Sequence, residues 1–391
     1  MDFVNTYTEK QKKKNGVYYT PEDISLFMAS KSKEIDDGVG IWLDPCCGLG
    51  ILSICLATLQ SDPVDFIQNR LVINEIDGNQ LKIAQQNFYE KFGVIPKSYN
   101  QDFLKLDLKY DYIIMNPPYF KYEKSDIYAY FLNKASNTTK GFISINPLSY
   151  TNGKNFETTR SNILKFKSIS LYHFDNIPGC IFKDASVRVS IIVTHNKFNS
   201  KKTTGLIRWK TEDRVKMINS IETHIDDAIL TSEVFYKTPK NTKEFISTKN
   251  TLSEYVSDNS NFPLYIASSP RYFLSASTER LDRVSQLVIY MKDLESYNNA
   301  LILLNSSYLY WWWRTVDSSM SLTKKTLLSL PWLCVKGKNQ TIIEKIKNSE
   351  INNKVYKLNA GRLQENVKHP KELLQELNLL FLNDKIIEIH N

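Results

Sequence analysis

Short apolar runs alternate with amphipathic segments along the first half of the chain. The apolar runs have the length and composition of buried strands, and they lie at 41–44, 71–75, 112–115, 141–147 and 169–174. The segments between them carry apolar residues at helical spacing, at 51–59, 127–135 and 156–166. Because repeated strand–helix units build a parallel sheet covered by helices, this pattern predicts an α/β fold with a doubly wound, mostly parallel sheet.

The strand–helix rhythm stops near residue 196. The polar segment 196–205 reads as structureless, so we predict two domains, 1–198 and 199–391, the second a mixed α+β domain. Residues 308–314, Tyr-Leu-Tyr-Trp-Trp-Trp-Arg, are the densest aromatic run. They form either a surface for nucleic-acid bases or a helix buried on all sides, and the preceding apolar residues 301–304 favour the buried helix.

Composition and charge limit the classes of protein to which the chain can belong. Hydrophobic residues make up 42% of the 391 residues, which is typical of a folded protein. The net charge is +8, and residues 200–391 hold 27 basic and 21 acidic side chains, which fits contact with a polyanion. The five cysteines form no C-x-x-C pair and do not cluster with histidines, so we expect neither a metal site nor a disulfide framework. Without a transmembrane-length apolar run or a signal segment, we expect a cytoplasmic protein that does not associate with membranes.

The tetrapeptide 116–119, Asn-Pro-Pro-Tyr, directly follows the strand 112–115. It suits the alkylation of a planar amino group, whose lone pair is delocalised into a π system. Two fixed acceptors, the Asn116 side-chain oxygen and the Pro117 carbonyl, can tilt the amino hydrogens so that the lone pair faces an electrophile. The prolines stiffen the loop, and Tyr119 offers a ring for stacking. The alternative is an ordinary Pro-Pro turn after a buried strand.

A glycine-containing loop follows the first strand. Residues 44–50, Asp-Pro-Cys-Cys-Gly-Leu-Gly, lead into the helix predicted at 51–59. Glycines at 48 and 50 allow a ligand close to the backbone, as in nucleotide cradles. The acidic Asp44 suits a cationic or amino-bearing ligand better than a phosphate. The alternative is a plain strand–helix turn.

Two further acidic residues, Glu75 and Asp102, occur where a nucleotide-binding α/β fold places contacts to its ligand. Glu75 ends the second strand, a position that commonly binds ribose hydroxyls, and Ile76 after it can pack on an adenine face. Asp102 can accept from an adenine amino group, and Phe103 can cover the ring. Taken alone, each acid is more often a solvated loop residue, and their order along the chain carries the interpretation.

Together these residues resemble the S-adenosylmethionine-dependent amino-methyltransferases of DNA, in the order of the gamma-type adenine enzymes of bacterial restriction–modification systems. The resemblance begins at residues 15–21, Asn-Gly-Val-Tyr-Tyr-Thr-Pro, and covers about half of the chain. It implies that Tyr19, Thr20, Cys46, Gly48 and Pro118 line the cofactor pocket with Asp44, Glu75, Ile76, Asp102, Phe103 and Asn116. The two adjacent cysteines, 46 and 47, stand where the family more often has small residues.

The resemblance also implies the rest of the reaction. The fold would be a Rossmann-like class I methyltransferase domain followed by a DNA target-recognition domain. The substrate would be an adenine N6 amino group in double-stranded DNA, with the base flipped out of the helix and stacked on Tyr119 and Phe182. A cognate restriction endonuclease would be the partner, and no metal would be required.

Other substrates remain open at this stage. Cytosine N4, an adenine in RNA and a protein glutamine all present planar amino groups that the same tetrapeptide suits. A catalytically silent DNA-binding subunit is the alternative outside enzymes.

Overall fold

The computed structural model describes residues 18–182, 186–225, 228–238, 246, 250–269, 273–317, 319–335, 339–359 and 361–382. The chain divides into two compact units, Met1–Asn241 and Thr242–Asn391, each described here by itself.

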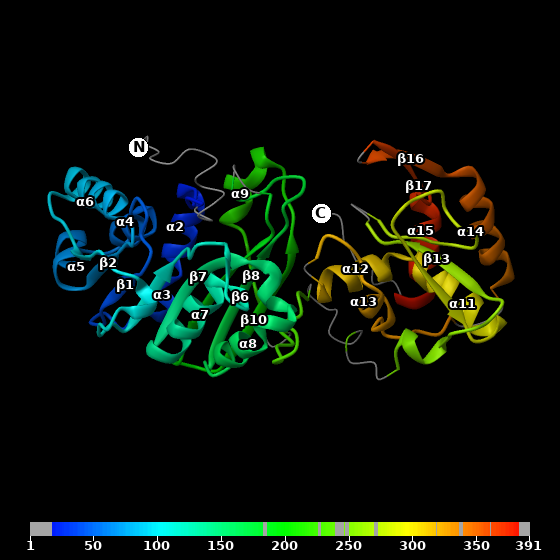
Figure 1. The fold of residues 1–391 in the computed structure, drawn as a ribbon, viewed down its shortest axis with the longest axis horizontal. Helices are drawn as coiled ribbons and strands as arrows, with labels where there is room; N and C mark the ends of the chain where they lie inside the picture. The colour runs from blue at the N-terminus through cyan, green and yellow to red at the C-terminus, as the bar shows by residue number, and fades with distance from the viewer. Residues whose placement is uncertain are drawn as a thin grey trace. The chain divides into compact units, whose positions relative to one another are not determined.

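The first unit contains a mixed sheet with the order β11-β10-β8-β9-β7-β4-β1-β2-β3 (Figure 1). Strands β3, β2, β1, β4 and β7 run parallel, β9 runs antiparallel to β7 and β8, and β10 is parallel to β8. The prediction of a doubly wound, mostly parallel sheet is therefore confirmed. The strands are β1 (Trp42–Asp44), β2 (Leu71–Asn74), β3 (Lys97–Tyr99), β4 (Tyr112–Met115), β7 (Gly141–Pro147), β8 (Ser168–Phe174), β9 (Val189–His195), β10 (Ser200–Ile207) and β11 (His224–Ile225), with a small hairpin of β5 (Lys121–Tyr122) and β6 (Ser125–Asp126).

Two apolar cores cover the two faces of this sheet. In β1, Trp42 belongs to the core under α2, α4 and α6, whereas Leu43 belongs to the core under α7 and α8. Because both faces are buried, central strands such as β2 and β4 read as apolar runs. The helices are α2 (Glu22–Ser30), α3 (Ser32–Ile35), α4 (Ile51–Thr58), α5 (Pro63–Asn69), α6 (Gly78–Phe92), α7 (Ile127–Thr138), α8 (Glu157–Ile163) and α9 (Arg214–Ile218).

The order of the strands creates a switch point between β1 and β4. The chain proceeds from β1 through β2 to β3 on one side, and β4 then returns to the other side of β1. Ligands of such sheets bind outside the carboxyl ends of the strands at this point. The predicted Asn-Pro-Pro-Tyr tetrapeptide follows β4, and the glycine loop follows β1.

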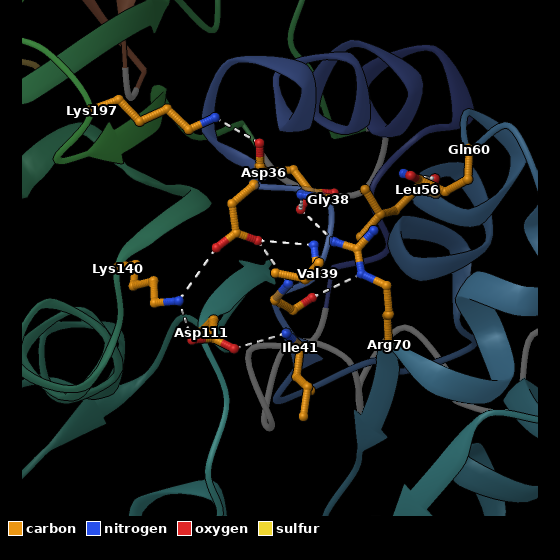
Figure 2. Close-up of polar contacts among 12 residues, drawn as sticks. Asp36, Gly38, Val39, Ile41, Leu56, Gln60, Arg70, Asp111, Lys140 and Lys197 are labelled. Atoms are coloured by element: carbon orange, nitrogen blue, oxygen red, sulfur yellow. Dashed lines mark hydrogen bonds and ion pairs between the residues drawn. The ribbon is translucent and has the colours of Figure 1, made fainter.

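A polar network anchors the loop that leads into β1 (Figure 2). Lys140 pairs with Asp37 at 3.3 Å and with Asp111 at 2.8 Å, and Asp111 accepts a hydrogen bond from the Ile41 backbone at 2.9 Å. Arg70 donates to a backbone carbonyl of the same loop at 3.1 Å. These contacts join the entry of β1 to the segments before β2, β4 and β7, and so fix β1 between β4 and β2.

The prediction that residues 196–205 are structureless is wrong for the second half of the segment. Strand β10 lies there and pairs in parallel with β8, so these residues belong to the first unit. Most of its side chains are partly or fully exposed, which is why no apolar run marks it. The units divide between Asn241 and Thr242, whereas the sequence placed the domain boundary at 198/199.

The second unit combines a sheet of order β12-β15-β13-β14 with helices and a separate hairpin, β16–β17. The prediction of a mixed α+β fold is confirmed. The aromatic run lies in α12 and is buried, so the interpretation as a buried helix is confirmed. The elements are β12 (Val256–Ser257), β13 (Pro263–Ala267), β14 (Ala276–Ser277), β15 (Gln286–Met291), β16 (Lys354–Asn359), β17 (Arg362–Val367), α11 (Leu294–Asn305), α12 (Ser307–Val316), α13 (Lys324–Leu328), α14 (Gln340–Asn352) and α15 (Lys371–Leu382).

Within the described ranges, no helix combines the length and apolar character that crossing a bilayer requires. The same ranges contain no group of three or more His, Cys, Asp or Glu side chains placed to hold a metal ion.

Candidate active site

A cavity of about 390 Å³ lies in the first unit, where the loops after β1, β2 and β4 meet. The sequence predicted site residues from six separate segments, and the fold brings most of them to this cavity. Those that line it are Tyr19, Thr20, Cys46, Gly48, Glu75, Ile76, Asp102, Phe103, Asn116, Pro117 and Pro118. Of the predicted residues, Asp44, Tyr119 and Phe182 do not line it.

The side-chain amide of Asn116 has a defined orientation in the cavity wall. Its Nδ2 donates to the Tyr18 carbonyl at 2.6 Å and to Thr20 Oγ1 at 3.0 Å. Its Oδ1 is buried and has no hydrogen-bond partner among the described residues. A buried acceptor without a donor is unfavourable, so a ligand with an N–H group would satisfy it.

The glycine loop and Glu75 hold each other in place. Gly48 adopts a φ of +54° and donates its backbone N–H to Glu75 Oε2 at 2.9 Å, while Glu75 Oε1 accepts from the Asp77 backbone at 3.1 Å. Gly50 has a φ of +82° immediately before α4. Both glycines occupy the left-handed region, which other residues rarely adopt. Burial raises the pKa of the Glu75 carboxyl above its usual value.

Asp44 lies behind the loop. Its carboxylate is 1% exposed and accepts from Ser53 Oγ and from the Cys46 backbone N–H. Burial, and to a smaller extent the nearby Glu75 carboxylate, raises the pKa of Asp44 to about 7. The Cys46 thiol donates to the Asn116 carbonyl at 3.4 Å, which links this loop to the one after β4.

Phe103, Asp102 and Ile76 also line the cavity. Phe103 is buried, with its ring centroid 5.0 Å from that of Phe131. Asp102 Oδ1 accepts from the Leu104 backbone at 3.0 Å. Ile76 is 70% exposed, so it belongs to the rim of the cavity.

Tyr119 and Phe182 form an aromatic cluster with Tyr18, which the sequence did not single out. The ring centroids lie 5.7 Å apart for Tyr18 and Tyr119, 5.8 Å for Tyr18 and Phe182, and 5.9 Å for Tyr119 and Phe182. Tyr119 also donates its hydroxyl to the Ile145 carbonyl at 3.1 Å. The stacking of a base on Tyr119 and Phe182 stays a prediction. The only sequence signal for Tyr18 was its place in the segment 15–21. Residues 15–17 of that segment lie outside the described residues.

With this geometry in place, the first part of the chain can be compared with known proteins. Residues 2–140 match the family of N-6 DNA methylases. The predicted resemblance to adenine amino-methyltransferases of DNA is thereby confirmed for this part of the chain. The match contains the glycine loop, Glu75, Asp102 and the tetrapeptide after β4.

Individual relatives agree with this family. The chain is 26% identical over 228 residues to the modification methylase CviBIII of Paramecium bursaria Chlorella virus NC1A, covering 52% of this chain and 55% of the relative. It therefore spans about half the length of that relative.

The fold is shared with the first of two similar solved structures. The DrdV–DNA complex matches with a TM-score of 0.51 at 16% identity, covering 67% of this chain and 36% of that one. A type I restriction–modification methyltransferase subunit from Streptococcus thermophilus matches with a TM-score of 0.42 at 17% identity, covering 53% of each chain.

The family and the fold imply S-adenosylmethionine as cofactor, and the residues of the cavity fit it. The buried Glu75 carboxylate lies at the end of β2, the position that binds ribose hydroxyls in such sheets. Apolar side chains of Ile76 and Phe103 line the cavity for a purine ring. The left-handed Gly48 keeps the loop free of a Cβ where a ligand would approach it.

Proposed function

We propose that the protein transfers a methyl group from S-adenosylmethionine to the N6 amino group of an adenine flipped out of duplex DNA. The observation that carries the proposal is the Asn116 Oδ1 atom, a buried acceptor without a partner in the described residues, in the wall of a cavity that fits the cofactor. An exocyclic amino group is the donor that this acceptor lacks.

The residues of the chain perform alignment rather than proton abstraction. When bound, the cofactor supplies an activated methyl group on a positively charged sulfur. Asn116 and the Pro117 carbonyl accept from the amino hydrogens and turn the nitrogen lone pair toward that carbon. Glu75 and Asp102 orient the ribose and adenine ends of the cofactor, and the two prolines keep the acceptors rigid.

The target base must leave the helix, since its amino group is otherwise paired. Extrusion costs a few kcal/mol. Stacking on Tyr119 and Phe182 returns about 1–3 kcal/mol per contact, a comparable magnitude. We propose that the base enters beside these rings, which requires the Tyr18 ring to move away from them.

The second unit serves as the target-recognition domain, and a cognate restriction endonuclease is the partner. This unit, Thr242–Asn391, holds 19 basic and 15 acidic side chains, an excess that supports contact with DNA, as do the modification methylase and the DNA complex among the similar proteins. Because all five cysteines are free, we place the protein in the cytoplasm.

One assay separates this function from its alternatives. Purified protein is incubated with labelled cofactor and, in turn, with plasmid DNA, structured RNA and protein extract, and the labelled nucleoside is identified after digestion. We expect label in N6-methyladenosine of the DNA. Label in N4-methylcytosine, in RNA or in protein would assign another substrate, and no turnover would favour a silent DNA-binding subunit.

Replacement of Phe182 with leucine tests the stacking role. Leucine keeps apolar volume in the core but removes the flat ring, so binding of DNA with an extruded base analogue should weaken about tenfold. The fluorescence of 2-aminopurine at the target position measures this, and calorimetry should give an unchanged cofactor affinity. Loss of cofactor affinity alone would place Phe182 in the cofactor pocket instead.

Cofactor affinity should depend on pH through Asp44. Below about pH 7 this carboxyl is protonated in the free protein, so the negative charge behind the glycine loop, which attracts a cationic ligand, is lost. Affinity for S-adenosylmethionine should therefore rise up to about tenfold from pH 6 to pH 8 and then level off. S-adenosylhomocysteine, which has a neutral sulfur and the same amino group, is the control in calorimetry. An equal pH dependence of both ligands would contradict a role for Asp44.

A further inference from the structure

The hydrogen bonds of Asn116 fix the orientation of its side-chain amide, whose Oδ1 is buried. Both Nδ2 protons are used, one by the Tyr18 carbonyl at 2.6 Å and one by Thr20 Oγ1 at 3.0 Å. Thr20 is 4% exposed, and its own carbonyl accepts from Ser25 Oγ at 3.5 Å. The two acceptors therefore lie on a segment joined to the start of α2, far from Asn116 in the sequence.

A rotated amide would be strongly disfavoured. Turning Asn116 by 180° about its last side-chain bond would bring Oδ1 against the Tyr18 carbonyl, and a backbone carbonyl accepts but never donates. The same rotation would put the amide N–H₂ where Oδ1 now lies, and an N–H₂ group cannot accept from a substrate amino group. The segment at 18–20 thus keeps the Asn116 oxygen directed toward a donor.

We propose that Thr20 is a positioning residue for methyl transfer, because its hydroxyl fixes the Asn116 amide with Oδ1 directed toward the substrate amino group. This deepens the proposed function and rests on it. It differs from the predicted role of Thr20 as a residue that lines the cofactor pocket. The two roles are compatible, since a hydroxyl that accepts from Asn116 still has a proton to donate.

Thr20→Val is the decisive variant, and Thr20→Ser is its matched control. Valine keeps the shape of threonine but removes the acceptor, whereas serine keeps the acceptor. At saturating cofactor and DNA, we expect kcat of Thr20→Val to fall about 10- to 100-fold and that of Thr20→Ser to stay within about threefold. The affinity for DNA carrying 2-aminopurine at the target should not change in either variant.

A second readout does not depend on activity. In protein labelled with ¹⁵N-asparagine, hydrogen exchange of the Asn116 side-chain amide should be slow, and Thr20→Val should make one of its protons exchange faster. The signal is assigned by its loss in Asn116→Ala. Thr20→Ser should exchange like the unsubstituted protein.

The outcomes separate this inference from the proposed function. Unsubstituted protein that methylates no DNA would overturn the proposed function itself. Active protein whose Thr20→Val variant keeps its kcat would overturn only the role of Thr20. A Thr20→Val defect that saturating cofactor removes would make Thr20 a cofactor contact and would likewise overturn the positioning role.

Discussion

Replacing Asn116 with alanine should reduce methyl transfer by about 10³-fold and leave cofactor affinity within a few-fold of its original value. The Asn116 Oδ1 atom is the buried acceptor that the substrate amino group would satisfy, so its loss removes lone-pair alignment rather than cofactor contacts. Single-turnover kinetics with saturating DNA measure the loss. Calorimetry with S-adenosylmethionine measures the affinity.

Asn116→Asp extends this test. Aspartate keeps the size of the side chain but replaces the N–H₂ group with an oxygen. That oxygen would face the Tyr18 carbonyl, to which Asn116 Nδ2 donates at 2.6 Å in the original protein. We expect a loss of activity comparable to that of alanine, because the acceptor is present but no longer held in place. Near-normal methylation by Asn116→Ala, with cofactor still bound, would exclude the mechanism.

Much of the first unit could be predicted because its central strands are buried on both faces. Tyr112–Met115, for example, is fully buried, so its apolar run marks a strand and locates the tetrapeptide that follows at the carboxyl edge of the sheet. The order of Asp44, Glu75, Asp102 and Asn116 then predicted one pocket. The structure brings Glu75, Asp102 and Asn116 to a common cavity.

Other features depend on tertiary contacts that no local pattern records. Strand β10 carries exposed lysines and small polar residues, because its place near the end of the sheet buries few of its side chains. Asp44 supports the glycine loop from behind because Ser53, nine residues later in α4, donates a hydrogen bond to its carboxylate. The contact of Tyr18 with Asn116 spans 98 residues of sequence, so only the fold reveals it.

Replacing Glu75 with alanine should have the opposite effect to replacing Asn116. Cofactor affinity should fall about 100-fold, and much of kcat should be recovered at saturating cofactor. Each Glu75 oxygen accepts from a backbone N–H, of Gly48 and of Asp77, and the side chain also lines the cavity. Hydrogen bonds to a charged group contribute about 1.5–3 kcal/mol each, so losing the ribose contacts and loosening the Gly48 loop accounts for a change of this size.

Glu75→Gln is the matched control for the Glu75 prediction. It retains one oxygen but turns an N–H₂ group toward one of the two backbone donors, so its affinity should lie between those of the original protein and of Glu75→Ala. Calorimetry gives the affinities, and kcat is measured over a range of cofactor concentrations. If Glu75→Ala bound S-adenosylmethionine normally, the ribose would lie elsewhere. If Asn116→Ala and Glu75→Ala lost affinity and kcat in the same proportion, the two residues would not act at separate steps, binding and alignment, as the geometry of the cavity implies.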